Sequence, residues 1–96
     1  MAKLRKLFEN AIAEYGGEIT KNAVMYHLER THNLDPDDIL NKPEQFVSAL
    51  RDMYGDFEII IEGSICEKIA EEYGVDYRGQ GLVELSKELK NTKIKK

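Results

Sequence analysis

Apolar side chains recur at steps of three and four residues along most of the chain, the spacing that places them on one face of an α-helix. The segments 3–15, 21–31, 43–54 and 57–73 follow this period, and a last one begins at Leu82. A short helical turn after Asp35 adds a sixth element. The sequence therefore predicts an all-α fold, a compact bundle of five to six short helices with short connections.

Local signals place the ends of these helices. Gly16 and Gly17 follow the first segment, and Thr20 precedes the second as its expected N-terminal cap. Asp35 followed by Pro36 is typical of a helix start, because the carboxylate caps the first turn and proline suits the first helical position. We expect the later helices to end at the glycines that follow them, Gly55 and Gly74.

Segment 57–73 is the most apolar of the chain. Its Ile59-Ile60-Ile61 run alone would suit a buried strand, but the helical period continues to Ile69, so we expect a helix. One face at helical spacing carries Phe57, Ile60, Ile61, Ser64, Ile65, Lys68 and Ile69, and Ile59, Cys66 and Tyr73 extend it sideways. The apolar side chains of this segment cover a wide arc of the helix for so small a domain. This arc fits either a central helix packed on two sides or a helix whose residues Phe57, Ile59 and Ile61 form a dimer or partner surface.

Charge divides the chain into an acidic body and basic ends. The net charge is −4, but residues 7–86 carry −11 and the two ends together +7. An acidic body repels phosphate backbones, which argues against a nucleic-acid partner. Lys3, Arg5 and Lys6 lie at the start of the first helix, where the helix dipole disfavours cations, so either the fold tolerates them there or a nearby acidic surface compensates them. We assign residues 1–92 to a single helical domain and 93–96 to a basic C-terminal tail.

The single cysteine and the absence of long apolar runs bear on the compartment. Cys66 has no partner for an internal disulfide, which indicates a reducing environment. No run approaches the roughly 20 apolar residues of a membrane helix, and the first ten residues do not resemble a signal peptide. We expect a soluble, cytoplasmic protein without a membrane partner, in which Cys66 acts as a small hydrophobe.

The polar side chains do not form a recognisable catalytic centre. His27 and His32 are five residues apart, and ligand pairs on one helix are usually three or four apart, so we predict no metal site. A calcium loop starting at Asp35 would need glycine where Leu40 stands and glutamate where Phe46 stands. We therefore expect no enzyme and no cofactor. The only candidate for a small ligand is the loop before the last helix, where Arg78, Gly79 and Gly81 precede free backbone N–H groups that bind anions.

One stretch resembles a known family. Val24-Met25-Tyr26-His27-Leu28-Glu29-Arg30 is similar to a hydrophobic-aromatic-His-Leu-Glu-basic segment of small archaeal helical domains, called the Nitrosopumilus output domain or a domain of unknown function. The likeness extends from Val24 to Tyr73, about half of the chain, and departs from the family at Asp56-Phe57-Glu58. It continues through Leu34, Asp38-Ile39, Pro43-Glu44-Gln45-Phe46, Ala49-Leu50, Tyr54-Gly55, Ile61-Glu62, Ile65 and Glu67.

The resemblance implies a module that occurs alone or attached to sensory and signalling domains in archaea, with no catalytic residues to carry over. It adds Tyr26 and His27 to the candidate interaction surface formed by Phe57, Ile59 and Ile61. The sequence thus predicts a non-enzymatic signalling or protein-interaction module, with a protein partner or a homodimer. The alternative is a domain that senses a small anion or an apolar molecule.

Overall fold

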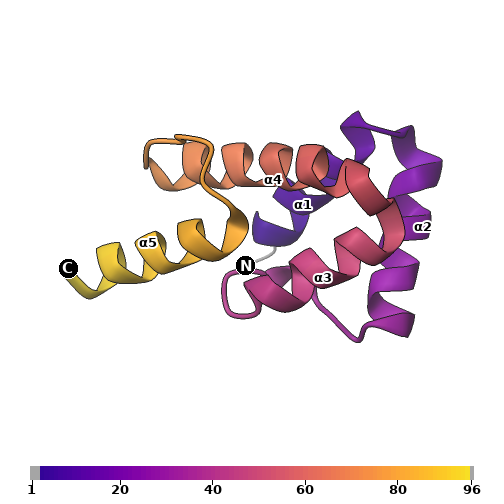
Figure 1. The fold of residues 1–96 in the computed structure, drawn as a ribbon, viewed down its shortest axis with the longest axis horizontal. Helices are drawn as coiled ribbons and strands as arrows, with labels where there is room; N and C mark the ends of the chain where they lie inside the picture. The colour runs from indigo at the N-terminus through magenta and orange to yellow at the C-terminus, as the bar shows by residue number, and fades with distance from the viewer. Residues whose placement is uncertain (1–2, 96) are drawn as a thin grey trace.

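The computed structural model describes residues 3–95, and within this range every regular element is helical. The α-helices are α1 (Lys3–Glu14), α2 (Gly17–Thr31), α3 (Pro43–Tyr54), α4 (Glu58–Tyr73) and α5 (Leu82–Lys95) (Figure 1). Two 3-10 turns, η1 (Pro36–Asp38) and η2 (Gly55–Phe57), lie before α3 and α4. The prediction of an all-α fold is confirmed, and the isoleucine run of segment 57–73 is helix, not strand.

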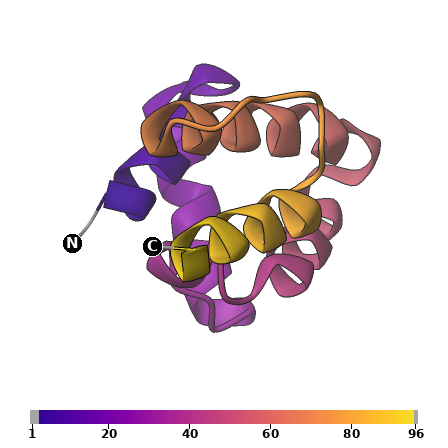
Figure 2. The ribbon, with the colours of Figure 1, turned by 90° about the vertical axis from the view of Figure 1, so that its left-hand side faces the viewer.

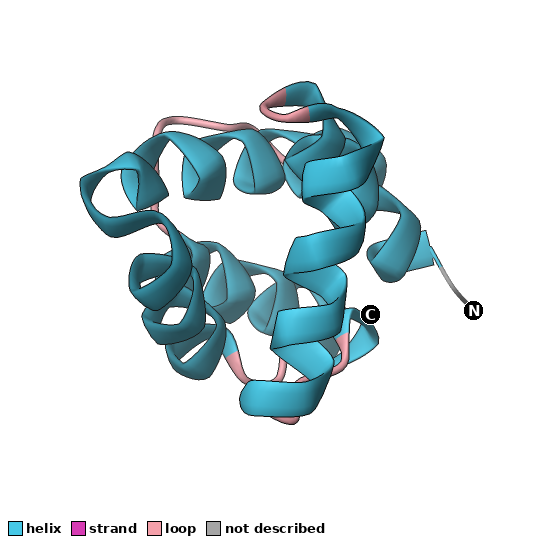
Figure 3. Cartoon of the chain, turned by 90° about the vertical axis from the view of Figure 1, so that its right-hand side faces the viewer, coloured by secondary structure: helices cyan, strands magenta, loops and turns pink. Residues whose placement is uncertain are grey.

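Helix α4 lies at the centre of the packing. It contacts α1 on one side and α3 and α5 on the other, while α2 packs on α1. After α4 ends, residues 75–81 run back along the helix before α5 begins (Figures 1 and 2). The helices enclose a central space that core side chains fill (Figure 3). The largest fully buried side chains are Phe8, Phe46, Ile12, Leu28, Ile39, Leu50, Ile61, Ile65, Ile69, Leu82, Leu85 and Cys66.

The start of α1 is compensated by acidic groups, which is one of the two outcomes that its charge pattern leaves open. Lys3 pairs with Glu72 at 2.9 Å, and the Arg5 guanidinium pairs with Asp35 at 3.0 Å. The backbone N–H of Arg5 also donates to a carboxylate oxygen of Asp37 at 3.2 Å. The turn η1 therefore supplies negative charge to the positive end of the α1 dipole.

Two predicted helix ends are confirmed. The Asp35 carboxylate accepts a hydrogen bond from the N–H of Asp37 at 3.0 Å, so it caps η1. Gly74 adopts the left-handed conformation (φ 71°) and its N–H donates to the last carbonyls of α4. At the other end of the chain, α5 continues through Lys95, so residues 93–95 of the predicted tail are helical.

The predicted cap of α2 was wrong. The helix begins at Gly17, not after Thr20, and no side chain among residues 3–95 caps it. Thr20 instead lies inside the first turn, directly over Gly16: a Cβ atom at position 16 would be 2.6 Å from the Thr20 side chain. Thr20 packs against Gly16 and lies within the first turn of the helix. Local capping rules instead predict it at the position just before the helix.

The buried stripe of α4 also differs from the predicted one. Glu58, Ile61, Ile65, Cys66, Ile69 and Ala70 are buried. Phe57 and Ile60, which the helical spacing places on one face with Ile61 and Ile65, are 41% and 44% exposed. The buried face of α4 is therefore displaced from the stripe that apolar spacing alone selects.

Candidate functional site

Exposed apolar side chains gather where α1 ends and α4 begins. Ile59 is 73% exposed, and Phe57 and Ile60, close to it in the sequence, are 41% and 44% exposed. The ring of Tyr15, at the end of α1, meets the ring of Phe57 edge to face with 5.8 Å between their centroids. We call this group, Tyr15, Phe57, Ile59 and Ile60, the apolar corner. Its side chains come from the turn after α1, from η2 and from the first turn of α4.

The predicted interaction surface is not one surface. Ile61 is fully buried in the core, so its inclusion was wrong: it lies on the side of α4 that the neighbouring helices cover. Tyr26 is exposed on α2, with the Arg30 guanidinium 5.1 Å from its ring centroid. His27, on the same helix, lies beside Asp52 of α3. Phe57 and Ile59 are thus the members that belong to the apolar corner.

A cleft of about 310 Å³ lies between the start of α4 and the loop 75–81. Its lining includes Arg51, Glu58, Glu62 and Tyr77. The Glu58 side chain is almost fully buried; one carboxylate oxygen lies 3.5 Å from the Arg51 guanidinium, and the other has no hydrogen-bond partner among the described residues. We call this the acidic cleft.

Burial sets the protonation of the groups in the acidic cleft. The pKa of Glu58 is raised to about 7: desolvation is the main cause, the neighbouring Glu62 carboxylate adds to the rise, and the Arg51 guanidinium opposes it. Burial, with the same two carboxylates, also raises the pKa of the Cys66 thiol to about 12. A neutral, buried thiol is a poor nucleophile, which agrees with the expectation that Cys66 acts as a small hydrophobe.

The predicted anion site at Arg78, Gly79 and Gly81 does not have the charge it needs. The first N–H of α5, on Leu82, donates to a carboxylate oxygen of Glu62 at 2.7 Å. The Arg78 guanidinium pairs with Glu88 at 2.6 Å. An anion at this helix start would face the Glu62 carboxylate, so the prediction was wrong: the tertiary fold supplies the anion from the protein itself.

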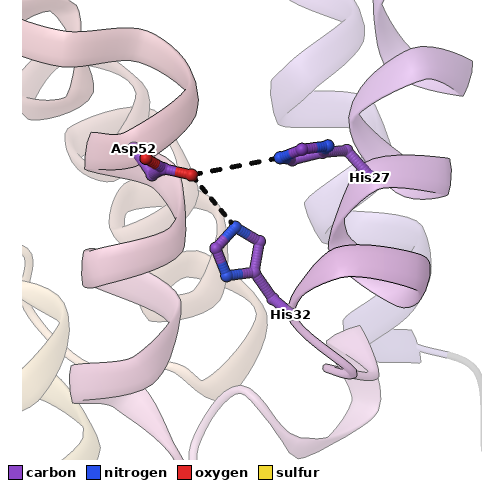
Figure 4. A group of neighbouring side chains, drawn as sticks. All are labelled: His27, His32 and Asp52. Carbon is purple, nitrogen blue, oxygen red and sulfur yellow. Dashed lines mark ion pairs between the residues drawn. The ribbon is translucent and has the colours of Figure 1, made fainter.

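The two histidines converge, contrary to the argument from their spacing. His32 follows the last residue of α2 as its C-cap, and its ring turns back toward that of His27, with 5.3 Å between centroids. Asp52 of α3 completes the group: its Oδ2 atom lies 3.4 Å from Nε2 of His32 and 4.0 Å from Nε2 of His27 (Figure 4). The sequence does not reveal this group, because the fold brings Asp52 of α3 beside the two histidines.

Comparisons of the chain with protein-family models, with curated proteins and with solved structures found no match. The resemblance of residues 24–73 to the Nitrosopumilus output domain therefore stays a prediction. Among residues 3–95, no helix combines the length and apolar character that crossing a membrane requires.

Proposed function

We propose that the chain is a non-enzymatic helical interaction module that binds a partner protein through the apolar corner. The observation that carries this proposal is the exposure of Ile59, 73%, beside half-exposed Phe57 and Ile60. Single apolar side chains on a surface are ordinary, but several at one end of a helix, with two aromatic rings in contact among them, are typical of a recognition surface. Aromatic residues such as Phe57 and Tyr15 are favoured anchors in interfaces.

The charge of the body indicates the chemistry of the partner. Residues 7–86 carry a net charge of −11, and Asp56 is exposed within the turn that holds Phe57. Two copies meeting at this corner would bring like charges together, whereas a partner with an apolar groove and a basic rim would complement both features. We therefore expect a different protein as partner, and treat a homodimer as the competing outcome.

The test compares Ile59→Glu with Tyr73→Glu. Tyr73 is a matched control because it is 40% exposed and lies at the opposite end of the same helix. Light scattering over a wide concentration range measures self-association, and quantitative capture from a cell lysate compares bound proteins across the variants. The proposal expects a monomer, and a partner that the wild type and Tyr73→Glu retain but Ile59→Glu loses.

Two results would contradict this form of the proposal. A dimer that Ile59→Glu abolishes and Tyr73→Glu keeps would assign the corner to self-association. A monomer whose bound proteins are the same in all three forms would remove the corner as an interaction surface. Circular dichroism would check that both variants fold, which we expect because both side chains are exposed.

A second candidate is small-ligand sensing in the acidic cleft, favoured by the unpartnered oxygen of the buried Glu58. The sequence predicted an anion as the ligand, but the carboxylates of Glu58 and Glu62 line the cleft. The cleft therefore fits a molecule that donates N–H groups, not an anion. A thermal-shift screen with small amines, amides and guanidines tests this. The ligand should raise the melting temperature of the wild type and not of Glu58→Gln; a panel without any such compound would count against sensing.

A further inference from the structure

We propose that His27, His32 and Asp52 form a binding site for a divalent transition-metal ion. Their three ligand atoms lie within 4.8 Å of one another. Nε2 of His32 and Nε2 of His27 lie 3.4 and 4.0 Å from the same carboxylate oxygen. A tetrahedral ion with bonds of about 2.0–2.1 Å needs ligand atoms roughly 3.3–3.4 Å apart, so small side-chain rotations would bring the group to that geometry.

Each ligand is held by a different part of the fold. His27 lies in the last turn and a half of α2, His32 is the residue at which that helix ends, and Asp52 lies near the end of α3. Figure 4 shows the two rings and the carboxylate directed toward one another from these elements. Three side chains that converge from two helices and a helix end form a more rigid set than neighbours on one exposed helix face.

The hydrogen bonds around these three side chains favour a bound metal ion over an ion pair between histidine and aspartate alone. Nδ1 of His27 lies 3.2 Å from the Thr31 hydroxyl; when it donates its hydrogen there, Nε2 presents a lone pair toward Asp52. Nε2 of His32 is itself buried and makes no hydrogen bond within the described residues. A buried polar nitrogen without a hydrogen bond costs free energy, and coordination to a metal ion would satisfy it.

The donor set selects the class of ion. Two imidazole nitrogens and one carboxylate suit Zn²⁺, Co²⁺, Ni²⁺ or Cu²⁺, whereas Ca²⁺ and Mg²⁺ prefer oxygen ligands alone. The side chains of His27 and Asp52 are 43% and 62% exposed, so water has access to the remaining coordination positions. The bound ion would link α2 directly to α3. This proposal is independent of the apolar corner.

The test uses the untagged, full-length protein after treatment with a chelator. Isothermal titration with Zn²⁺ and with Co²⁺ measures affinity and stoichiometry, and the absorption spectrum of the Co²⁺ form reports coordination. The wild type should bind one ion, and His27→Gln, His32→Gln and Asp52→Asn should each bind at least about tenfold more weakly. Asp56→Asn is the matched control, because it removes an exposed carboxylate four residues further along and should leave the affinity unchanged.

The proposal also predicts a stability change that separates it from binding elsewhere. A saturating concentration of Zn²⁺ should raise the melting temperature of the wild type and of Asp56→Asn, but not of the three ligand variants. The proposal is overturned if the wild type binds neither ion, or if the ligand variants bind as tightly as Asp56→Asn. In that case the group is an ion pair between histidine and aspartate only.

Discussion

The Glu62 carboxylate accepts a hydrogen bond at 2.7 Å from the backbone N–H of Leu82, the first residue of α5. A residue in the middle of one helix thus caps the start of another, 20 positions further along the chain. The contact fixes the point at which the loop 75–81 leaves α4 and α5 begins. It also holds a negative charge beside Glu58, so the same carboxylate stabilises α5 and perturbs the acidic cleft.

Removing this cap should destabilise the fold. We expect Glu62→Ala to lower the free energy of unfolding by about 1–2 kcal/mol, because it leaves a helix-start N–H without its charged acceptor. Urea unfolding at pH 5 is the suitable measurement, since Glu58 is then largely protonated and relief of repulsion does not mask the loss. Glu67→Ala, an exposed glutamate on the same helix, is the control. Equal stability of the two variants would contradict the cap.

Glu58 should make stability depend on pH near neutrality. Its pKa is raised from 4.5 to about 7 in the folded protein, so the folded state holds the proton more tightly than the unfolded chain. The contribution of Glu58 to stability is fully present below pH 4.5 and is lost as the pH rises through about 7. We expect the free energy of unfolding of the wild type, relative to Glu58→Gln, to fall by roughly 1–3 kcal/mol between pH 5 and pH 8.

The Glu58→Gln variant is the control for this prediction, because it leaves the charged groups around position 58 unchanged. Glu62 and Arg51 are the charged neighbours that act on Glu58, and Glu58→Gln leaves both in place. Urea unfolding of the two proteins at several pH values therefore isolates one titration. Parallel curves for the wild type and Glu58→Gln across this range would show that Glu58 titrates normally in the fold.

Features encoded locally were predictable from the sequence. Asp35 followed by Pro36 specifies a helix start within three residues, and Gly74 specifies an end, so neither needs tertiary information. The last helix begins at Leu82 as predicted, and Leu82, Leu85 and Leu89 recur at the helical period and are buried. Such signals are short in range, and the structure confirms them.

The parts that failed depend on contacts between distant segments. Thr20 has the chemistry of a cap, but its packing over Gly16 places it inside α2. Asp52 joins the histidines only because α3 lies beside the end of α2. Glu58 has the sequence signature of a solvated glutamate, and its burial depends on α3 and the loop 75–81, which no local pattern reports.

Gly16 should tolerate no side chain. Its φ of −175° is open to any residue, so the cost of Gly16→Ala comes from contact alone: the new Cβ would lie 2.6 Å from Thr20 atoms. We expect a loss of about 1–3 kcal/mol in the free energy of unfolding. In a double-mutant cycle with Thr20→Gly, the pair should lose less than the sum of the single variants. Additive losses would show that Thr20 is not the obstacle.

Gly63 should behave in the opposite way. It lies inside α4, where glycine is less favourable than alanine, and a Cβ there would meet only the Tyr77 hydroxyl, at 3.4 Å. We expect Gly63→Ala to raise the free energy of unfolding by about 0.5–1 kcal/mol. Thermal unfolding measures the melting temperatures of the wild type, Gly63→Ala and Gly16→Ala side by side. A destabilised Gly63→Ala would mean that Tyr77 packs too tightly over the helix to move.

Ile59 and Ile61 lie on different faces of α4: Ile59 faces solvent and Ile61 lies in the core. Ile61 is fully buried, so Ile61→Ala should lose about 2–5 kcal/mol through lost burial and the cavity left behind. Ile59 is 73% exposed, so Ile59→Ala should change the free energy of unfolding by no more than about 0.5 kcal/mol. Both variants are measured by urea unfolding at low protein concentration, where association does not contribute. If Ile59→Ala were as costly as Ile61→Ala, α4 would be rotated in solution and the apolar corner would not exist as described.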